Sequence, residues 1–335
     1  MFRNENEFED AFVNELIERG WDEKVFEYKT EEDLWKNWAD IICNNSANKV
    51  KDRLNGYPLI PEEIDQIKEL IAQKKTPYEL NKLINGKTIS IKRQNKDDIE
   101  HFGKEISLSI FDRGDVCGGY SKYQIARQTR HSAKDDISRS KRSDITLLIN
   151  GMPLIHIELK NTGVPILQAC WQIKQYHKEG VFTGLFAMVQ IFVAMTPEEH
   201  LYFANVSDYN KISKKAMFSW ADFNNNSLFN IENSGKNKNE NWKKVVEYLL
   251  SIPMAHQLIG YYTVADSSDE SLKVFRSYQY FAVEQIVKRV NDAQWTENDK
   301  LGGYIWHTTG SGKTMTSFKA GKDCRTLKNA TRLFF

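Results

Sequence analysis

Residues 143–163 read SDITLLINGMPLIHIELKNTG, two apolar runs on either side of an Asn-Gly dipeptide. Asn-Gly between alternating apolar segments is the strongest short-range signal for a β-hairpin. Each predicted strand also carries charged residues that a buried sheet tolerates poorly, namely Asp144, Glu158 and Lys160. The hairpin therefore predicts a core sheet, and its charges indicate that this sheet does more than pack.

The alternation of side chains along a strand sets the register of this hairpin. A three-residue loop over 150–152 pairs Asp144 with Glu158 and gathers the apolar side chains on the other face. A two-residue loop would instead place Asp144 opposite Ile157, which mixes a charge into the apolar face. The apolar pattern therefore predicts the three-residue loop, and with it two carboxylates beside the ammonium of Lys160.

Two adjacent carboxylates repel each other unless a cation lies between them, and a set of oxygen ligands without Cys or His suits Mg²⁺. We expect Asp144 and Glu158 to be the metal ligands. Mg²⁺ keeps positions for a phosphate oxygen and a water, as phosphodiester hydrolysis requires. Lys160 would orient or help to deprotonate that water and offset the developing charge. The alternative is a surface strand whose charged face is held by a Glu–Lys pair.

The next segment, ELKNTGVPILQACWQIKQY over 158–176, narrows the choice. It resembles the nuclease core of the restriction (R) subunit of type I restriction–modification enzymes. That family has a PD-(D/E)xK pattern followed by QxxxY. The match here is Asp144, Glu158 and Lys160, then Gln172 and Tyr176. The last two are four residues apart on one predicted helix, so both can point at the same site.

The resemblance implies further residues and partners. It implies that Gln172 and Tyr176 contact DNA and support the active site. It also implies a glutamate from the first helix, expected over 5–20; Glu9 is our choice and Glu5 the alternative. The implied partners are double-stranded DNA and the methyltransferase and specificity subunits of the complex.

A second motif, HTTGSGKT over 307–314, lies between a predicted apolar strand at 304–306 and a predicted helix. Backbone N–H groups of a glycine loop at a helix N-terminus form an anion cradle. This arrangement predicts ATP binding, with Lys313 on the phosphates and the Thr314 hydroxyl on Mg²⁺. The full predicted nucleotide site is Gln279, Gly310, Ser311, Gly312, Lys313 and Thr314. The segment FRSYQ (275–279) is similar to the part of the R subunit in which Gln279 would read adenine, with Arg276 nearby.

The order of elements predicts an α/β protein with two domains. Residues 1–260 are expected to form an endonuclease domain of the PD-(D/E)xK, restriction-endonuclease-like type, a mixed sheet flanked by helices. Residues 261–335 are expected to begin a RecA-like motor that is truncated after its Walker A motif. Helices are predicted over 5–20, 31–54, 61–84 and from Pro165 to about Glu179.

Composition limits the class of partner. The 335 residues carry a net charge of only +1, so a polyanion must be met by local patches. One basic segment precedes the first hairpin strand and predicts contact with the phosphate backbone; its members are Lys122, Arg127, Arg130, Lys134, Arg139, Lys141 and Arg142. Four scattered cysteines, no signal peptide and no membrane-length apolar run favour a cytoplasmic protein without a membrane partner.

These observations predict a type I site-specific deoxyribonuclease, as the N-terminal part of an R subunit. Its expected activity is Mg²⁺-dependent cleavage of double-stranded DNA, which the longer enzyme couples to ATP-driven translocation. ATP hydrolysis is not expected from these residues alone. Two alternatives stay open: a stand-alone repair nuclease of the same superfamily, and a catalytically inert assembly module.

Overall fold

The computed structural model describes residues 2–131, 141–229, 240–292 and 302–325. The chain divides into two compact units, one of residues 1–220 with 228–274 and the other of residues 221–227 with 275–335. Along the main chain the division thus falls after Val274 rather than after Gly260. The reason is that a hairpin formed by β9 and β10 contacts helix α5 within the first unit.

The helices and strands follow one another as alternating α and β segments. In the first unit the helices are α1 (Glu5–Glu18), α2 (Glu31–Asn44), α3 (Ser46–Lys49), α4 (Pro61–Ala72), α5 (Pro77–Asn85), α6 (Ile166–Glu179), α7 (Trp242–Tyr248) and α8 (Ile252–Gly260), with 3₁₀ turns η1 (Gly184–Met188), η2 (Tyr209–Lys211) and η3 (Lys214–Ala216). Its strands are β1 (Phe26–Glu27), β2 (Thr88–Lys92), β3 (Glu105–Ser109), β4 (Tyr123–His131), β5 (Lys141–Ile149), β6 (Met152–Leu159), β7 (Ile191–Met195), β8 (His200–Ala204), β9 (Thr263–Asp266) and β10 (Ser271–Val274). The second unit contains α9 (Ser277–Asp292) and α10 (Lys313–Cys324).

The core of the first unit is a six-stranded mixed sheet with the order β1-β4-β5-β6-β7-β8. Strands β4, β5 and β6 form an antiparallel meander, and β7 returns parallel to β6. Helix α6 makes this crossover, as a parallel connection requires. Every residue of β6 and of β7 is buried, which agrees with their nearly continuous apolar sequence. The expected mixed sheet flanked by helices is therefore present.

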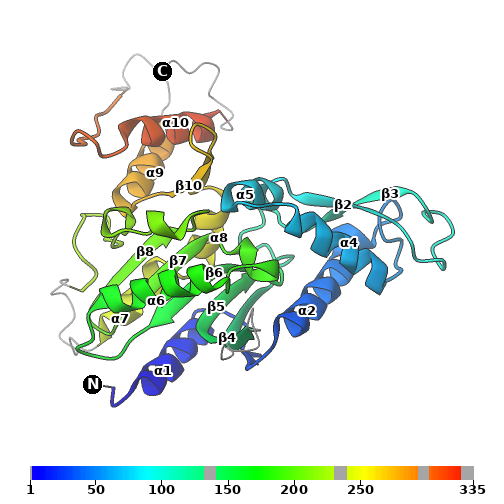
Figure 1. The fold of residues 1–335 in the computed structure, drawn as a ribbon. Coiled ribbons are helices and arrows are strands. Elements are labelled where there is room, and N and C mark those ends of the chain that lie inside the picture. Colours follow the sequence, from blue (N-terminus) through cyan, green and yellow to red (C-terminus); the bar gives the residue numbers. More distant parts are fainter. Residues whose placement is uncertain (1, 132–140, 230–239, 293–301, 326–335) are drawn as a thin grey trace. The chain divides into compact units, whose positions relative to one another are not determined.

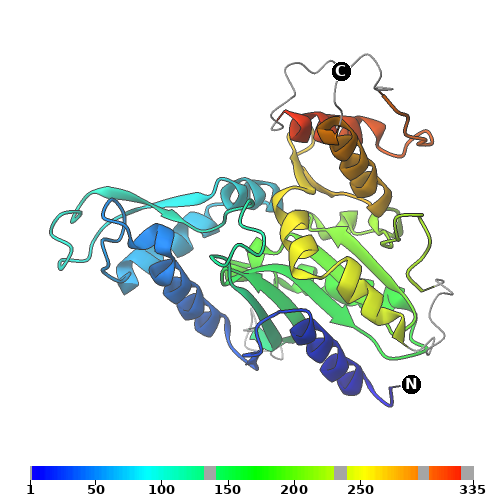
Figure 2. The same cartoon turned by 180° about the vertical axis from the view of Figure 1, so that it is seen from behind.

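Helices cover both faces of this sheet. Figure 1 shows α6 in front of the sheet, and Figure 2 shows α7 and α8 over the opposite face. Helix α1 packs against α7 through aromatic side chains, because Trp242 lies 5.5 Å from Phe8 and 6.0 Å from Phe12 between ring centroids. The charged hairpin strands β5 and β6 thus lie inside a layered structure, and the alternative of a surface strand is wrong.

The hairpin turn differs from the prediction. Ile149 pairs with Met152, so the turn has two residues, Asn150 and Gly151, and both have positive φ, 53° and 83°. This backbone is typical of a type I′ turn. The predicted three-residue loop is therefore wrong.

The predicted pairing of Asp144 with Glu158 is nevertheless consistent with the observed register of the two strands. A β-bulge between Leu147 and Leu148 shifts the pairing by one residue, so Thr146 pairs with His156 and Ile145 with Ile157. Continuing this ladder by one residue brings Asp144 opposite Glu158. The bulge, rather than the turn, supplies the extra residue.

Two predicted helices are each interrupted. The segment 31–54 contains α2 and the short α3, because the Asn45 side chain accepts a hydrogen bond from the backbone N–H of Ala47 and so begins a new helix. The segment 61–84 breaks between α4 and α5, where Thr76 and Glu79 form a capping box around Pro77. The predicted helices over 5–20 and 165–179 are confirmed as α1 and α6.

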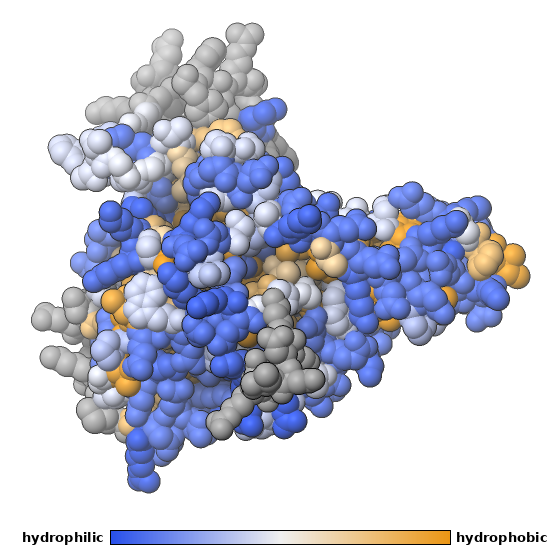
Figure 3. Space-filling view, viewed as in Figure 1, coloured by the Kyte–Doolittle hydropathy of each residue, from blue (hydrophilic) through white to orange (hydrophobic). Residues whose placement is uncertain are grey.

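Strands β2 and β3 form a separate two-stranded arm. Figure 3 shows hydrophobic surface at the end of this arm, where Ile99 is 86% and Phe102 51% exposed. The loop between the two strands is held by Arg93, whose buried guanidinium donates to Glu63 at 2.7 Å and to Asp98 at 2.9 Å. Among the described helices, none is both long and apolar enough to cross a lipid bilayer.

Candidate active site

Asp144, Glu158 and Lys160 meet at one end of strands β5 and β6. The Lys160 Nζ atom lies 3.2 Å from Glu158 Oε1 and donates to the carbonyl of Leu159 at 2.7 Å. The backbone N–H of Leu159 donates to Asp144 Oδ2 at 2.9 Å. All three side chains are buried, and Glu158 has no exposed surface. The structure therefore brings the three predicted residues together on the sheet.

Burial sets the protonation of this cluster. It raises the pKa of Glu158 to about 7, although the ammonium of Lys160 opposes the shift. Burial and the nearby charge of Glu158 raise the pKa of Asp144 well above its ordinary value. Burial alone would lower the pKa of Lys160, but Glu158, Asp144 and Glu5 outweigh it and raise that pKa. Without a further cation, burial therefore favours the protonated forms of the two acids, while the acids favour the ammonium form of Lys160.

His156 lies beside Glu158 without a hydrogen-bond partner. Its Nε2 atom is 3.6 Å from Glu158 Oε2, and neither of these buried atoms makes a hydrogen bond in the described structure. Phe182, with its ring centroid 5.2 Å away, and Tyr176, at 6.3 Å, enclose the imidazole. Burial lowers the pKa of His156 to about 4, so the ring is neutral. The alternation of side chains along β6 puts His156 on the same face as Glu158, but no sequence signal indicated this contact.

The first helix contributes both candidate glutamates, in different ways. Glu5 Oε1 lies 3.3 Å from Lys160 Nζ and so joins the cluster directly. Glu9 is buried and accepts from Arg127 Nε at 2.8 Å and from Gln128 Nε2 at 2.9 Å. Glu9 reaches the cluster only through its charge, which helps to raise the pKa of Asp144. The contact with Lys160 belongs to Glu5, and the preference for Glu9 stays a prediction.

Gln172 and Tyr176 form a short relay from α6 to β5. Gln172 Nε2 donates to the Tyr176 hydroxyl at 2.8 Å, and that hydroxyl donates to the carbonyl of Arg142 at 2.8 Å. Arg142 precedes Asp144 by two residues on the same strand. The relay therefore ties the helix to the strand that carries the acid, which is a supporting role.

The basic segment is partly neutralised. Arg127 pairs with Glu9, with Asp10 at 2.6 Å and with Glu27 at 3.5 Å. Lys141 pairs with Glu179 at 3.3 Å. Lys134 and Arg139 lie outside the described residues. Arg130 and Arg142 remain exposed beside the strand end.

The residues at the site fit Mg²⁺ better than a softer metal. In the part of the chain that the structure describes, no three His, Cys, Asp or Glu side chains form a metal cage. Mg²⁺ is commonly held by one or two carboxylates, with waters and substrate phosphates completing its shell. Glu158 Oε2, buried and without a hydrogen-bond partner, is an oxygen that such a cation would satisfy.

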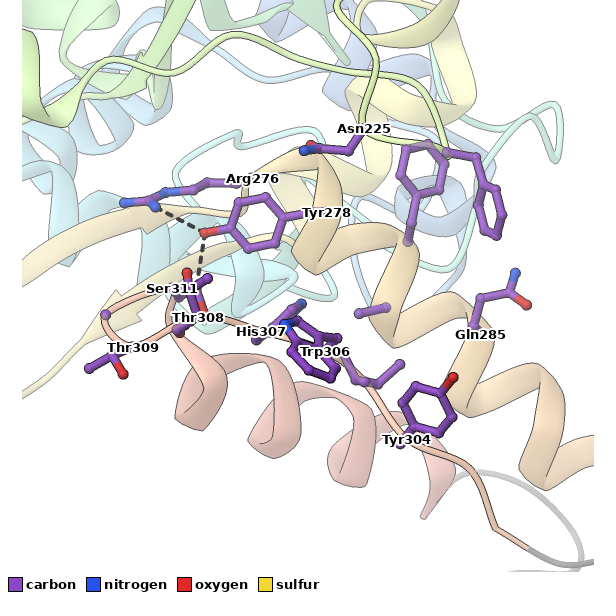
Figure 4. Close-up of a pocket in the computed structure, with 15 residues that line it drawn as sticks. Asn225, Arg276, Tyr278, Gln285, Tyr304, Trp306, His307, Thr308, Thr309 and Ser311 are labelled. Carbon is purple, nitrogen blue, oxygen red and sulfur yellow. Dashed lines mark hydrogen bonds between the residues drawn. The ribbon is translucent and has the colours of Figure 1, made fainter.

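The second unit contains the glycine loop. The loop ends at Gly312, where α10 begins, and both Gly310 and Gly312 have positive φ, 78° and 82°. Figure 4 shows the open pocket of about 640 Å³ beside it, between the loop and α9. Lys313 Nζ lies 3.4 Å from the carbonyls of His307 and Thr308. The loop-to-helix geometry of a phosphate cradle is present.

Other parts of the nucleotide-binding site differ from what the sequence predicted. Residues 304–306 form no strand, so the predicted strand before the loop is wrong for the described residues. Tyr304 and Trp306 are 88% and 87% exposed, because no neighbouring strand of the described chain covers them. Gln279 accepts from the backbone N–H of Arg276 at 2.9 Å and donates to the carbonyl of Ser311 at 3.1 Å. Its amide therefore fastens α9 to the loop.

Family models match both parts of the chain, and several curated proteins are similar to it. A family model described as the N terminus of type I restriction enzyme R protein matches residues 2–211, and a SWI2/SNF2 ATPase model matches residues 278–335. The chain is 30% identical, over 96% of its length, to the type I restriction enzyme SauCOLORF180P endonuclease subunit of Staphylococcus aureus strain COL, and it spans 30% of that protein. It is 31% identical to the SsaAORF53P endonuclease subunit of Staphylococcus saprophyticus, again over 96% of this chain and 30% of the relative. It is 26% identical to the EcoprrI endonuclease subunit of Escherichia coli, over 83% of this chain and 88% of that one.

Proposed function

The chain belongs to the type I restriction enzyme R-protein family, and from this premise we propose that its first unit is a Mg²⁺-dependent endonuclease acting on double-stranded DNA. The observation that carries the proposal is the buried cluster of Asp144, Glu158 and Lys160 on adjacent strands. Burying two carboxylates side by side costs free energy that an ordinary core avoids. Such a cluster is expected where chemistry requires it.

Each member of the cluster has a role in the proposed reaction. Asp144 and Glu158 would hold Mg²⁺, which would supply Lewis-acid activation of a phosphate oxygen and of a water. The neighbouring carboxylates raise the pKa of Lys160 and so favour its ammonium form, which suits a role in orienting the phosphate and offsetting its developing charge. Glu5 and the Leu159 carbonyl hold the ammonium in place.

The second unit supports a nucleotide-binding function for the longer protein. The glycine loop, the start of α10 and the match to a SWI2/SNF2 ATPase model support ATP as the ligand. Because the chain spans 30% of the staphylococcal relatives it matches, coupling of ATP hydrolysis to DNA translocation is proposed only for the longer protein. The proposed partners are double-stranded DNA and the methyltransferase and specificity subunits.

Cleavage of supercoiled plasmid DNA tests the nuclease proposal. The chain, alone and mixed with the methyltransferase and specificity subunits, is incubated with Mg²⁺ or with EDTA. We expect cleavage only with Mg²⁺, and a loss of about 100-fold or more in Glu158→Ala and Lys160→Ala, because these groups act on the metal and the transition state.

Glu198→Gln is the matched control, since Glu198 is an exposed acid outside the cluster and its loss should leave cleavage unchanged. Cleavage at the unmodified rate by either cluster variant would remove these residues from the mechanism. Folded variants that bind DNA but do not cut it agree with the proposal. A chain that never cuts, in any mixture, would favour the inert assembly module.

A further inference from the structure

Two arginines face each other across strands β4 and β5, next to the catalytic strand end. Arg130 and Arg142 are a directly opposed cross-strand pair. Both are exposed, and neither makes an ion pair with a carboxylate among the described residues. Like charges placed directly opposite one another in a sheet are destabilising. Their juxtaposition therefore needs a reason other than stability.

An aromatic ring holds this pair. The guanidinium carbons of Arg130 and Arg142 each lie 6.0 Å from the ring centroid of Tyr28. Tyr28 follows β1, is 46% exposed, and has a left-handed backbone with φ of 52°. A non-glycine residue seldom adopts that conformation without a local reason. The ring attracts both cations but neutralises neither of them.

The arginine pair lies on the face of the sheet that carries the cluster. Arg142 and Asp144 are two residues apart on β5 and share a face, about 7 Å apart along the strand. The backbone at Arg142 is fixed, because its carbonyl accepts the Tyr176 hydroxyl. One strand of DNA places a phosphate every ~3.4 Å along the helix axis. The pair is therefore within one or two nucleotides of a phosphate bound at the cluster.

We propose that Tyr28, Arg130 and Arg142 form a phosphodiester-binding subsite that grips the DNA backbone beside the scissile phosphate. The planar fork of a guanidinium matches the oxygens of a phosphate, and a phosphate between the two arginines removes their mutual repulsion. The subsite rests on the proposed nuclease function for the identity of its anion. Arg127, although in the same basic segment, has no part in it because three carboxylates already neutralise it.

Salt-dependent DNA binding tests the subsite without requiring cleavage. Binding of a short fluorescein-labelled duplex to the 335-residue chain is measured by anisotropy in EDTA over a range of salt concentrations. Each lost phosphate contact lowers the slope of log K against log salt by about 0.9. Because the two arginines share one phosphate, we expect Arg130→Gln/Arg142→Gln to lower the slope by about 0.9 and the affinity roughly 10-fold at about 0.1 M salt.

Two further variants test whether binding requires the planar guanidinium group of arginine or only a positive charge. Arg130→Lys/Arg142→Lys should keep the slope and lose affinity, because lysine lacks the bidentate fork. Lys215→Gln removes one exposed charge in η3, outside the basic segment, and should change neither quantity. Thermal unfolding of each variant shows whether it is folded.

The outcomes are distinct. An unchanged slope in the glutamine double variant, unmodified affinity in the lysine double variant, or no duplex binding by the unmodified chain at low salt would each overturn the subsite. Arginine-dependent binding by a chain that does not cut DNA in any mixture would remove the proposed nuclease function and leave the subsite. Mg²⁺-dependent cleavage by a chain whose DNA binding is unchanged in both arginine variants would remove the subsite and leave the proposed nuclease function.

Discussion

At the scale of single residues, the buried acids of the cluster should make the stability of the fold depend on pH. Burial raises the pKa of Glu158 to about 7 in the folded chain, whereas an unfolded glutamate titrates near about 4.3. Between these values the folded chain holds a proton that the unfolded chain has released. The free energy of unfolding therefore falls as pH rises through this window. Burial shifts Asp144 in the same direction.

We accordingly expect the thermal midpoint in EDTA to fall between about pH 5 and pH 8, and Mg²⁺ to restore part of the loss at pH 8 by binding the folded form. Glu158→Gln should flatten this pH dependence, because the amide does not titrate. Thermal denaturation over a pH series measures both effects. An equally steep dependence in the variant would show that Glu158 does not cause it.

His156 is a residue for which stability and activity should oppose each other. Its ring nitrogens are buried without hydrogen bonds, a state that costs about 1–3 kcal/mol for each such group. His156→Leu should therefore raise the free energy of unfolding. The same change removes the polar group that lies 3.6 Å from Glu158 Oε2, so we expect cleavage to fall.

His131 provides the matched control for this prediction. It is also buried, but its Nε2 atom is 3.0 Å from the Ser143 hydroxyl, so His131→Leu leaves a buried hydroxyl unpaired and should lower stability. Urea denaturation and plasmid cleavage are measured on both variants. A His156→Leu chain that is less stable than the unmodified chain would contradict the explanation.

At the scale of elements, the β5–β6 turn is held by its fit against α2. A Cβ atom on Gly151 would lie 2.9 Å from the Cα of Trp38, and φ at Gly151 is 83°. Gly56 has a similar φ of 80° but nothing within 4 Å of such an atom. Gly56→Ala therefore measures the backbone cost alone, about 1–2 kcal/mol.

Gly151→Ala should cost more than Gly56→Ala, because the helix must also move away from the turn. The difference in the free energy of unfolding between the two variants, measured in urea, isolates this packing. We expect the larger loss in Gly151→Ala, and equal losses would show that α2 does not constrain the turn. Since the turn and the bulge together set the register, a shifted turn should also reduce cleavage.

At the scale of the whole molecule, we expect the two units to differ in whether they can be active within this chain alone. In the first unit, the buried core surrounds the cluster of Asp144, Glu158 and Lys160. In the second, the described residues hold the phosphate cradle with no strand before it, and phosphoryl transfer depends on positioning and on charge stabilisation around the phosphates. We expect residues 1–335 alone to bind nucleotide weakly at most and to show no DNA-stimulated ATP hydrolysis.

An ATPase assay with and without duplex DNA measures this directly, with Lys313→Ala as the control because Lys313 is the cation of the loop. DNA-stimulated turnover that disappears in Lys313→Ala would contradict the expectation. Turnover that persists in that variant would come from another source.

Local patterns determined much of this protein in advance. The alternation over 143–160 was sufficient to predict two paired strands and the face that carries Asp144 and Glu158, and Pro165 marked the start of the helix that follows them. Glycine and lysine spacing was sufficient to predict the phosphate cradle. These features depend on residues close together in the sequence, where the period of a strand or helix decides which side chains share a face.

Only the tertiary structure decided the contacts between distant segments. Whether Glu5 or Glu9 reaches Lys160 depends on how α1 lies against β6, and both glutamates suit the sequence of the helix equally well. The turn has two residues and a bulge in place of the predicted loop, and Gly151 of this turn lies against Trp38 of α2. Arg127 and Arg142 looked alike in one basic segment, yet three carboxylates neutralise the first and none of the described ones pairs with the second. Such distinctions depend on packing between elements far apart in the sequence, which local periodicity does not specify.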